Sequence, residues 1–291
     1  MVKSSYGYPR RVLLAAIGDL VLDITIAPER DLRPDDDTPA SIRVGGGGQA
    51  ANFCAWTASL GESARLITRV GDDEAGRRLV AELEASGVQV RAVRGSDPTG
   101  AIAVLVGPGG HRTMATQRGA SVGLRREDLQ AEWFEAVDLL HVPAYSLFTE
   151  PLAGAARAAV EFAHLRQARV AVDLSSVAGL LDYGPARMMS ELSRVKPDLV
   201  FATAAEADVM PIPIDRLAPV TAVKLGAEGA IVCGRRIAAP ATQIVDATGA
   251  GDAFAAAFCI SMLHGRSPQE SGEHAVRIAA AAVAQVGARP A

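Results

Sequence analysis

The residues best suited to chemistry lie in one short stretch near the C-terminus, Asp246-Ala247-Thr248-Gly249-Ala250-Gly251-Asp252. Gly249 and Gly251 lack a Cβ atom, so the backbone there can turn sharply and approach a ligand closely. An alanine-rich apolar run over residues 253–263 follows, which predicts a buried helix. The first amides of a helix have no partner within it and carry partial positive charge. The stretch therefore predicts an anion-binding turn.

The carboxylate of Asp252 stands in this turn, where its negative charge repels a bound phosphate. A chemical role that fits this position is to accept a proton from a hydroxyl group that attacks a phosphoryl group. The simpler interpretation is that Asp252 caps the helix, as aspartate commonly does. The stretch alone leaves both interpretations open.

A second glycine-rich stretch, residues 45–50, fits the pattern G-x-G-x-x-A, and Asp72 and Asp73 follow about twenty residues later. This arrangement is typical of dinucleotide-binding enzymes, so an oxidoreductase is an alternative. Two strands are expected before these glycines, whereas the fingerprint usually follows the first strand of its unit. The oxidoreductase interpretation also leaves residues 246–252 without a function.

Strand and helix patterns alternate along most of the chain, which predicts a mainly parallel sheet with helices on both faces. We expect these strands at 11–17, 65–70, 88–93, 138–142, 169–174, 198–201, 220–225 and 230–233. We expect helices at 49–60, 74–86, 125–136, 151–165, 185–195, 204–210, 253–263 and 269–286. No shift in composition marks a second domain. The prediction is therefore one α/β domain over residues 1–291.

A different pattern marks the strands expected at 20–27, 41–44, 101–106 and 112–116, the last two joined by a turn at 107–110. In these strands apolar and polar residues alternate, which is typical of a sheet with one face in contact with water. They should therefore form a small sheet apart from the main one. One face of it should be exposed and apolar, so we expect a homodimer through this sheet.

Together the motifs Gly18-Asp19-Leu20-Val21-Leu22-Asp23, Gly47-Gly48-Gln49-Ala50-Ala51-Asn52 and Asp246–Asp252 resemble the ribokinase-like (PfkB) carbohydrate kinase family. Residues 100–120 resemble the lid hairpin of that family, and residues 223–230 resemble its nucleotide-side strand and turn. The resemblance spans essentially the whole chain. It implies a three-layer ribokinase-like sandwich with a small β lid formed by about 20–44 and 100–118. The P-loop pattern G-x-x-x-x-G-K-[ST] is absent, so the protein is not a P-loop enzyme.

The resemblance also implies roles for individual residues. Asp252 would be the catalytic base, and the amides of Gly249, Ala250 and Gly251 would form an anion hole for the transferred phosphoryl group. The implied substrate-binding residues are Asp19, Asp23, Gly47, Gly48, Asn52 and Arg118. The implied nucleotide-binding residues are Thr203, Glu206, Lys224, Gly226, Gly229 and Thr248. Asp19 could instead face solvent or cap a turn, and Arg118 could instead be a solvated surface side chain.

The cofactors implied by the resemblance are ATP, Mg²⁺ and, in some relatives, K⁺. The N-x-x-E motif of the family is present as Thr203-Ala204-Ala205-Glu206, and a position that is usually asparagine is Ser175. Glu206 would hold Mg²⁺ through water, with weaker or rearranged metal binding. A K⁺ site would use Asp246, Ala282, Gln285, Gly287 and Ala291. These departures keep a non-catalytic family member as an alternative.

The expected reaction is transfer of the γ-phosphate of ATP to a hydroxyl group of a small sugar. A nucleoside kinase of the same family is the alternative. The N-terminal half offers only Tyr8, Phe53 and Trp56 as candidate partners for a nucleobase, which favours a free sugar.

Composition excludes several other classes of protein. The net charge is −4 with scattered charges, which argues against a nucleic-acid partner. No run reaches the roughly 18 apolar residues of a membrane span, and the polar N-terminus does not resemble a signal peptide. Cys54, Cys233 and Cys259 lie in apolar runs and are expected to be reduced core residues, so we expect a cytoplasmic protein.

Overall fold

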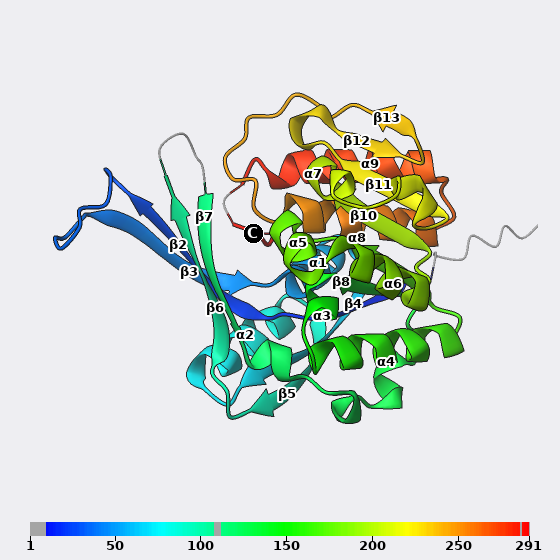
Figure 1. Ribbon diagram of the computed structural model, residues 1–291, viewed down its shortest axis with the longest axis horizontal. Helices are drawn as coiled ribbons and strands as arrows, with labels where there is room; N and C mark the ends of the chain where they lie inside the picture. Colours follow the sequence, from blue (N-terminus) through cyan, green and yellow to red (C-terminus); the bar gives the residue numbers. More distant parts are fainter. Residues whose placement is uncertain (1–9, 108–111, 286, 291) are drawn as a thin grey trace, which may run out of the picture.

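The computed structural model describes residues 10–107, 112–285 and 287–290 (Figure 1). Its main sheet has the strand order β13-β12-β11-β10-β9-β8-β1-β4-β5. Pairing is parallel throughout except at β12 and β13, which pair antiparallel at one edge of the sheet. The strands are β1 (Leu13–Ile17), β4 (Ser63–Gly71), β5 (Val88–Gly95), β8 (Leu139–Pro143), β9 (Arg169–Asp173), β10 (Leu199–Thr203), β11 (Val220–Lys224), β12 (Ala230–Val232) and β13 (Arg235–Ile237). The expected parallel α/β fold is confirmed.

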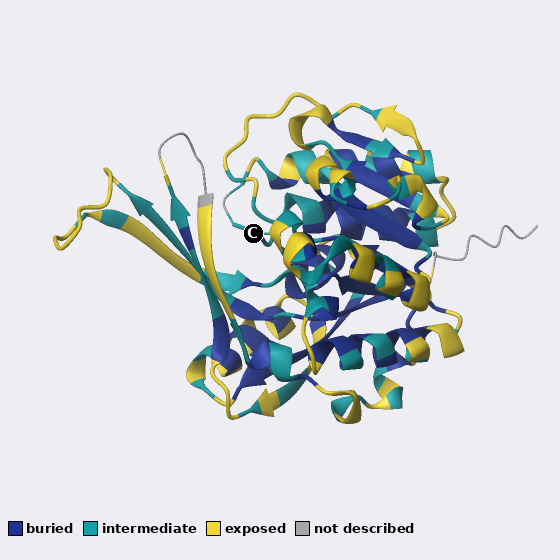
Figure 2. Ribbon diagram, in the orientation of Figure 1, coloured by how far each residue is buried: buried dark blue, intermediate teal, exposed yellow. Residues whose placement is uncertain are grey.

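Helices cover both faces of this sheet, as the burial colouring of Figure 2 shows. Because successive strand residues point to opposite faces, Leu14 and Ala16 of β1 join one core cluster while Leu13, Ala15 and Ile17 join the other. The first cluster includes α1 (Gln49–Ser59), α2 (Glu74–Ala85), α8 (Ala250–Leu263) and α9 (Pro268–Ala282). The second includes α4 (Leu152–Leu165), α5 (Val177–Tyr183) and α6 (Pro185–Val195), with the short α3 (Tyr145–Phe148) and α7 (Ala204–Asp208) beside them.

A separate four-stranded sheet with the order β3-β2-β6-β7 projects from one side of the molecule (Figure 1). Its strands are β2 (Val21–Pro28), β3 (Ala40–Gly47), β6 (Thr99–Val106) and β7 (Arg112–Gly119). The expected small sheet is therefore present, although most of its predicted turn at 107–110 lies outside the described residues.

The two faces of this projecting sheet differ in character. Ile24 pairs with Val44 and Ile26 with Ile42, so these apolar side chains share one face. Asp23, Thr25 and Arg43 belong to the other face and line a cleft against the body of the protein. Ile42 is 61% exposed and Val44 47% exposed. The face turned away from the cleft is thus apolar and open to water at Ile42, whereas Val44, closer to the turn at Gly48, also borders the cleft.

The prediction of a helix at 125–136 is wrong. The segment forms two 3₁₀ turns, Arg126–Asp128 and Ala131–Phe134, because the backbone is extended at Leu129 and Gln130 between them. This break accompanies the burial of Phe134, whose ring stacks on Phe162 of α4 at 4.9 Å. Packing against α4 outweighs the helical preference of the local sequence.

Several boundaries also differ from the expected ones. β3 continues through Gly45, Gly46 and Gly47, because each of them pairs with β2, so the chain turns only at Gly48. α8 begins at Ala250, before the expected start, and is buried on all sides rather than along one stripe. α9 ends at Ala282 instead of 286. The elements α3, α5 and β13 were not expected.

The cysteine prediction is correct for Cys54 and Cys259, which are buried free thiols, and wrong for Cys233, which is exposed. Cys233 occupies the turn between β12 and β13, where a left-handed backbone (φ 46°) places it at the surface. Within the described ranges, no helix is both long enough and apolar enough to cross a membrane.

Candidate active site

The carboxyl ends of three neighbouring parallel strands bring charged and polar side chains together. Asp173 ends β9, Thr203 ends β10 and Lys224 ends β11. Thr203 pairs with Lys224, and Asp173 pairs with Phe201, two residues before Thr203. In open α/β sheets this edge is where ligands bind.

The N-terminus of α8 lies at the same edge and requires a glycine at its cap. Gly249 has the left-handed φ of 76°, and a Cβ atom there would lie 2.1 Å from the carbonyl oxygen of Ala288. The N–H group of Ala250 makes only a long bond of 3.4 Å to the Ala247 carbonyl. The first turn of α8 therefore begins beside the strand ends, a position suited to an anion. The anion hole at Gly249, Ala250 and Gly251 stays a prediction.

Asp252 lies in the first turn of α8 and does not cap it, because the cap residue is Gly249 and no side chain completes the cap. The carboxylate is buried, and its Oδ2 accepts a hydrogen bond of 3.0 Å from Nδ2 of Asn52. Burial raises the pKa of Asp252 to about 7, although the bond from Asn52 opposes this shift. A carboxylate with such a pKa can both accept and release a proton near neutral pH.

Lys224 and Asp173 form a buried ion pair, with 2.6 Å between Nζ and Oδ2. A Cβ atom at Gly251 would lie 3.4 Å from this Nζ, so the ammonium group stands beside the first turn of α8. Burial lowers the pKa of Lys224, but the attraction of Asp173 and Glu206 outweighs burial and raises it. Lys224 is therefore a fixed cation next to the first turn of α8.

Thr203 and Glu206 form a reciprocal cap at the start of α7. Oγ1 of Thr203 accepts from the Glu206 amide at 3.3 Å, and Oε2 of Glu206 accepts from the Thr203 amide at 2.8 Å. Burial and the nearby Asp173 raise the pKa of Glu206. Sequence reasoning placed both residues near the nucleotide but did not identify this capping role.

The donor set suits a metal ion held mainly by phosphate groups and water. Among the described residues no group of three or more His, Cys, Asp or Glu side chains could hold a metal ion by itself. Mg²⁺ commonly binds through one or two carboxylates together with substrate phosphates and water. One carboxylate, Glu206, near enough to Lys224 to raise its pKa, fits that pattern.

Two further glycines, predicted from the sequence to bind the nucleotide, shape the turn after β11. Gly226 and Gly229 flank the 3₁₀ turn that follows β11, and both have positive φ. At Gly229 a Cβ atom would lie 2.0 Å from the carbonyl oxygen of Ile237, so only glycine fits there. The backbone of this turn therefore packs closely against β13.

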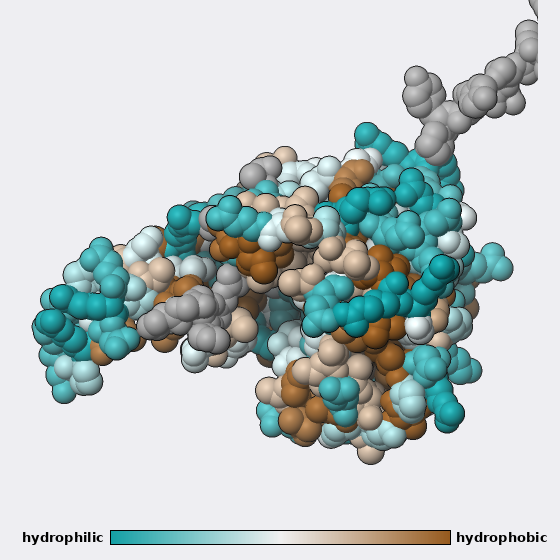
Figure 3. All heavy atoms as spheres, turned by 90° about the horizontal axis from the view of Figure 1, so that it is seen from above, coloured by the Kyte–Doolittle hydropathy of each residue, from teal (hydrophilic) through white to brown (hydrophobic). Residues whose placement is uncertain are grey.

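A cleft of about 480 Å³ lies between the projecting sheet and the body, and Figure 3 shows the recess from above. Its lining residues are Asp23, Thr25, Ala27, Ser41, Arg43, Val44, Gly45, Gly46, Val106, Val245, Asp246, Gly287 and Ala288. Asp23 lies against Gly47, where an added Cβ would be 3.1 Å from the Cβ of Asp23. A Cβ at Gly48 would be 2.2 Å from the carbonyl oxygen of Asp19. The two N-terminal motifs are thus packed together, as expected for one binding region.

Asp19 and Arg118 bind each other rather than facing solvent. Nε and Nη2 of Arg118 each donate a 2.8 Å hydrogen bond to the Asp19 carboxylate, and Nη1 donates to the Tyr145 carbonyl at 2.9 Å. Both side chains are mostly buried. The pair connects β7 of the projecting sheet to the loop after β1.

Arg289 belongs to this region and was missed by sequence reasoning. Nε of Arg289 donates to Oδ1 of Asn52 at 3.2 Å, and Nη2 donates to the Gly47 carbonyl at 3.0 Å. The available signal was a single arginine in a C-terminal segment of otherwise small or apolar residues. Such a residue could not be placed without the fold.

Asp246 holds the backbone just before α8. Its Oδ1 accepts from the Thr248 amide at 2.8 Å, and its Oδ2 accepts from the Gly287 amide at 3.1 Å. Ala291, another residue of the predicted K⁺ site, lies outside the described residues. The K⁺ site stays a prediction.

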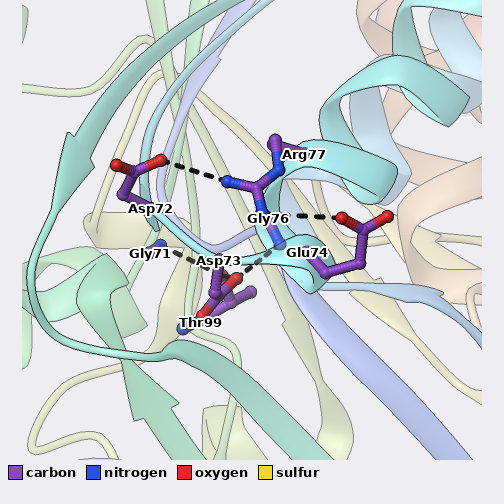
Figure 4. Close-up of polar contacts among 7 residues, drawn as sticks. All are labelled: Gly71, Asp72, Asp73, Glu74, Gly76, Arg77 and Thr99. Carbon is purple, nitrogen blue, oxygen red and sulfur yellow. Dashed lines mark hydrogen bonds and ion pairs between the residues drawn. The ribbon is translucent and has the colours of Figure 1, made fainter.

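The dinucleotide interpretation fails at its acidic residue. The carboxylate of Asp73 caps α2 by accepting from the Gly76 amide, and it also accepts from the amide and hydroxyl of Thr99, each at 2.7 Å (Figure 4). Asp72 pairs with Arg77 at the surface. Both carboxylates therefore serve the helix start rather than a ribose.

A family model for pfkB family carbohydrate kinases matches residues 12–291. The chain belongs to this family. It is 31% identical over 291 residues to the ATP-dependent ribose-1-phosphate kinase of Halopiger xanaduensis, covering 97% of this chain and 94% of the relative.

Solved structures of similar proteins have the same fold as this PfkB kinase. The adenosine kinase of Sinorhizobium meliloti has a TM-score of 0.84 and 27% identity, covering 97% of this chain and 96% of that one. A putative ribokinase II of Escherichia coli, solved with ATP and Mg²⁺, has a TM-score of 0.83 and 22% identity, covering 95% and 94%. The expected family, the ribokinase-like fold and the kinase class are confirmed.

Proposed function

We propose that this PfkB kinase transfers the γ-phosphoryl group of ATP to a sugar hydroxyl, with Asp252 as the catalytic base. The observation that carries this proposal is a buried carboxylate with a pKa raised to about 7, placed in the first turn of α8. Asp252 takes the proton of the acceptor hydroxyl as its oxygen attacks the γ-phosphorus. The bond from that phosphorus to the bridging oxygen breaks, and ADP leaves.

The phosphate side of the reaction is assigned to the turn and the strand ends. The amides of Gly249, Ala250 and Gly251 and the ammonium group of Lys224 stabilise the negative charge on the transferred group. When bound, Mg²⁺ would neutralise charge on the phosphates, and Glu206 would hold it through water. Thr203, Gly226, Gly229 and Thr248 are assigned to the nucleotide.

The acceptor is assigned to the cleft beneath the projecting sheet, which acts as a lid. Asp23, with Gly47, Gly48 and Asn52, binds its hydroxyl groups, and the Asp19–Arg118 pair anchors the lid. None of the described residues that line the cleft is aromatic, which favours a sugar over a nucleobase. A nucleoside is the second candidate, because one structural neighbour is an adenosine kinase.

Release of ADP, measured with pentoses, hexoses, sugar phosphates, sugar acids and nucleosides, tests this function. The proposed function is supported if the best acceptor is a sugar or a sugar phosphate and if Asp252→Asn no longer phosphorylates that acceptor. A nucleoside as the best acceptor overturns the sugar assignment. If no acceptor causes ATP to be converted to ADP, the result supports the non-catalytic alternative.

We also propose that the lid pairs two subunits through its outer face, where Ile42 and Val44 are exposed. Reduced thiols at Cys54 and Cys259 are compatible with action in the cytoplasm, which we propose as its place. We further propose that K⁺ activates the enzyme by binding near Asp246.

A further inference from the structure

Arg289 is a half-buried cation that binds two groups of the acceptor region. It donates to the side-chain oxygen of Asn52 and to the backbone oxygen of Gly47. Its Nη1 lies so close to Gly46 that an added Cβ there would be 2.1 Å away. Within the described part of the chain, no carboxylate lies within ion-pair distance of Arg289. The guanidinium is therefore held by an amide and a carbonyl instead of a counter-ion.

This contact fixes which way the Asn52 amide faces. A guanidinium group can only donate hydrogen bonds, so the atom of Asn52 that faces Arg289 must be the oxygen, Oδ1. The NH₂ group of the amide then faces the opposite way and donates to Asp252 at 3.0 Å. If the amide turned over, its oxygen would face the carboxylate and repel it.

We propose that Arg289 is a positioning residue for phosphoryl transfer, which orients the Asn52 amide so that it holds the Asp252 carboxylate in place. The proposal rests on the proposed role of Asp252 as the base. Arg289 acts through Asn52 and does not contact Asp252. A residue from the segment after α9 thereby completes a site whose other parts come from α1 and α8.

The charges around Asp252 give this arrangement a measurable consequence. Burial raises the pKa of Asp252, the Asn52 bond lowers it, Asp173 of β9 raises it, and Lys224 of β11 and Arg289 lower it. α9 also packs on α8, but its His274 contacts Ser261 near the other end of that helix. Burial lowers the pKa of Arg289 to about 10, so it stays charged at neutral pH. Loss of Arg289 should therefore raise the pKa of Asp252.

The test compares pH profiles of kcat for the wild type, Arg289→Met and Arg289→Lys. The acid limb of Arg289→Met should move to higher pH by about one unit, because one cation and one oriented donor are lost. Arg289→Lys keeps the charge and should show a smaller shift. The KM for ATP should stay within about twofold, because Arg289 is on the acceptor side.

A matched control is Arg65→Lys, together with Arg65→Met. Arg65 is a buried arginine with a similar set of partners: its Nε donates to a side-chain amide, Gln89, and its Nη1 donates to the Trp133 carbonyl. It lies in β4, away from the site. Its variants should lower the melting temperature without moving the acid limb. If the Arg289 variants behave in the same way, with lower stability and an unmoved limb, Arg289 is structural and the proposal is wrong.

A double-mutant cycle with Asn52→Ala tests whether the effect passes through Asn52. In the Asn52→Ala background, Arg289→Lys should add little to the displacement of the acid limb. Fully additive shifts overturn the proposal, since they mean that Arg289 acts on Asp252 independently of the amide. Asp252→Asn separates this proposal from the proposed function. Normal turnover in Asp252→Asn would show that Asp252 is not the base. If Asp252→Asn loses turnover but the acid limb of the Arg289 variants does not move, only the role of Arg289 is overturned.

Discussion

Asn52 and Asp252 stand 200 positions apart in the sequence, and the amide of the first donates a 3.0 Å hydrogen bond to the carboxylate of the second. The bond joins the start of α1 to the start of α8, so the N-terminal and C-terminal glycine motifs meet at one point. It also opposes the effect of burial on the pKa of Asp252. The pKa of the carboxylate consequently stays near neutral pH, where a catalytic base is most effective.

Asp252→Asn should lower kcat by about 10²–10⁴-fold, the usual contribution of a positioned base. Asparagine has the same shape and can still accept the bond from Asn52, so the fold should persist. Affinity for ATP should be unchanged or higher, because a negative charge near the phosphates is removed. Steady-state kinetics and nucleotide calorimetry measure these effects. A kcat within a few-fold of the wild type would contradict the mechanism.

The stability of the same variant should depend differently on pH. The pKa of Asp252 is about 7 in the folded protein and 3.8 ordinarily, so the folded state binds its proton more tightly. The wild type should therefore lose stability as pH rises from about 4 to about 7, as the linkage of protonation to folding requires. Asp252→Asn has no such loss. Melting temperatures of the two proteins should diverge in favour of the variant over this range, and parallel curves would contradict the raised pKa.

The local structure of the C-terminal motif was predictable because it depends on nearby residues. Gly249 must be glycine for its φ of 76°, and Asp252 follows it in the same turn. The alternation of apolar and polar residues in β2 likewise revealed a sheet with one exposed face. Neither prediction needed a contact from elsewhere in the chain.

Features that depend on distant contacts were not predictable. The helix expected at 125–136 was wrong because Phe134 packs against α4, which local preference does not reveal. Arg289 and the pairing of Asp19 with Arg118 depend on the folded path of the chain. The cap formed by Thr203 and Glu206 was visible as a capping-box pattern, but the family motif drew attention to the metal instead.

Lys224→Met should destabilise the protein by about 3–5 kcal/mol, because it leaves the buried Asp173 carboxylate without its counter-ion. The double variant Lys224→Met with Asp173→Asn removes both charges and should recover much of this loss. Denaturant unfolding of the two single variants and the double variant measures the coupling. Additive losses would show that the 2.6 Å pair contributes no coupling energy to the fold.

Glu206→Gln should raise the Mg²⁺ concentration needed for half-maximal activity more than it raises the KM for the acceptor. Glutamine can still accept the hydrogen bond of the Thr203 amide, so the cap of α7 and the melting temperature should be preserved. Thr203→Asn restores the residue type of the family motif and should lower the Mg²⁺ requirement. Identical Mg²⁺ titrations for wild type and Glu206→Gln would mean that Glu206 serves only the cap.

Ile42→Lys should convert a lid-mediated dimer into a monomer. Ile42 is 61% exposed on the lid face turned away from the cleft, and it pairs with Ile26 on that face. A lysine there places a charge at the centre of the proposed contact, where burial without a partner is costly. Leu165→Lys is a matched control, because Leu165 is 79% exposed at the end of α4, away from the lid. Light scattering at micromolar concentration should give a dimer for the wild type and for Leu165→Lys, and a monomer for Ile42→Lys. A wild-type monomer, or a dimer that survives Ile42→Lys, would place the subunit contact elsewhere or remove it.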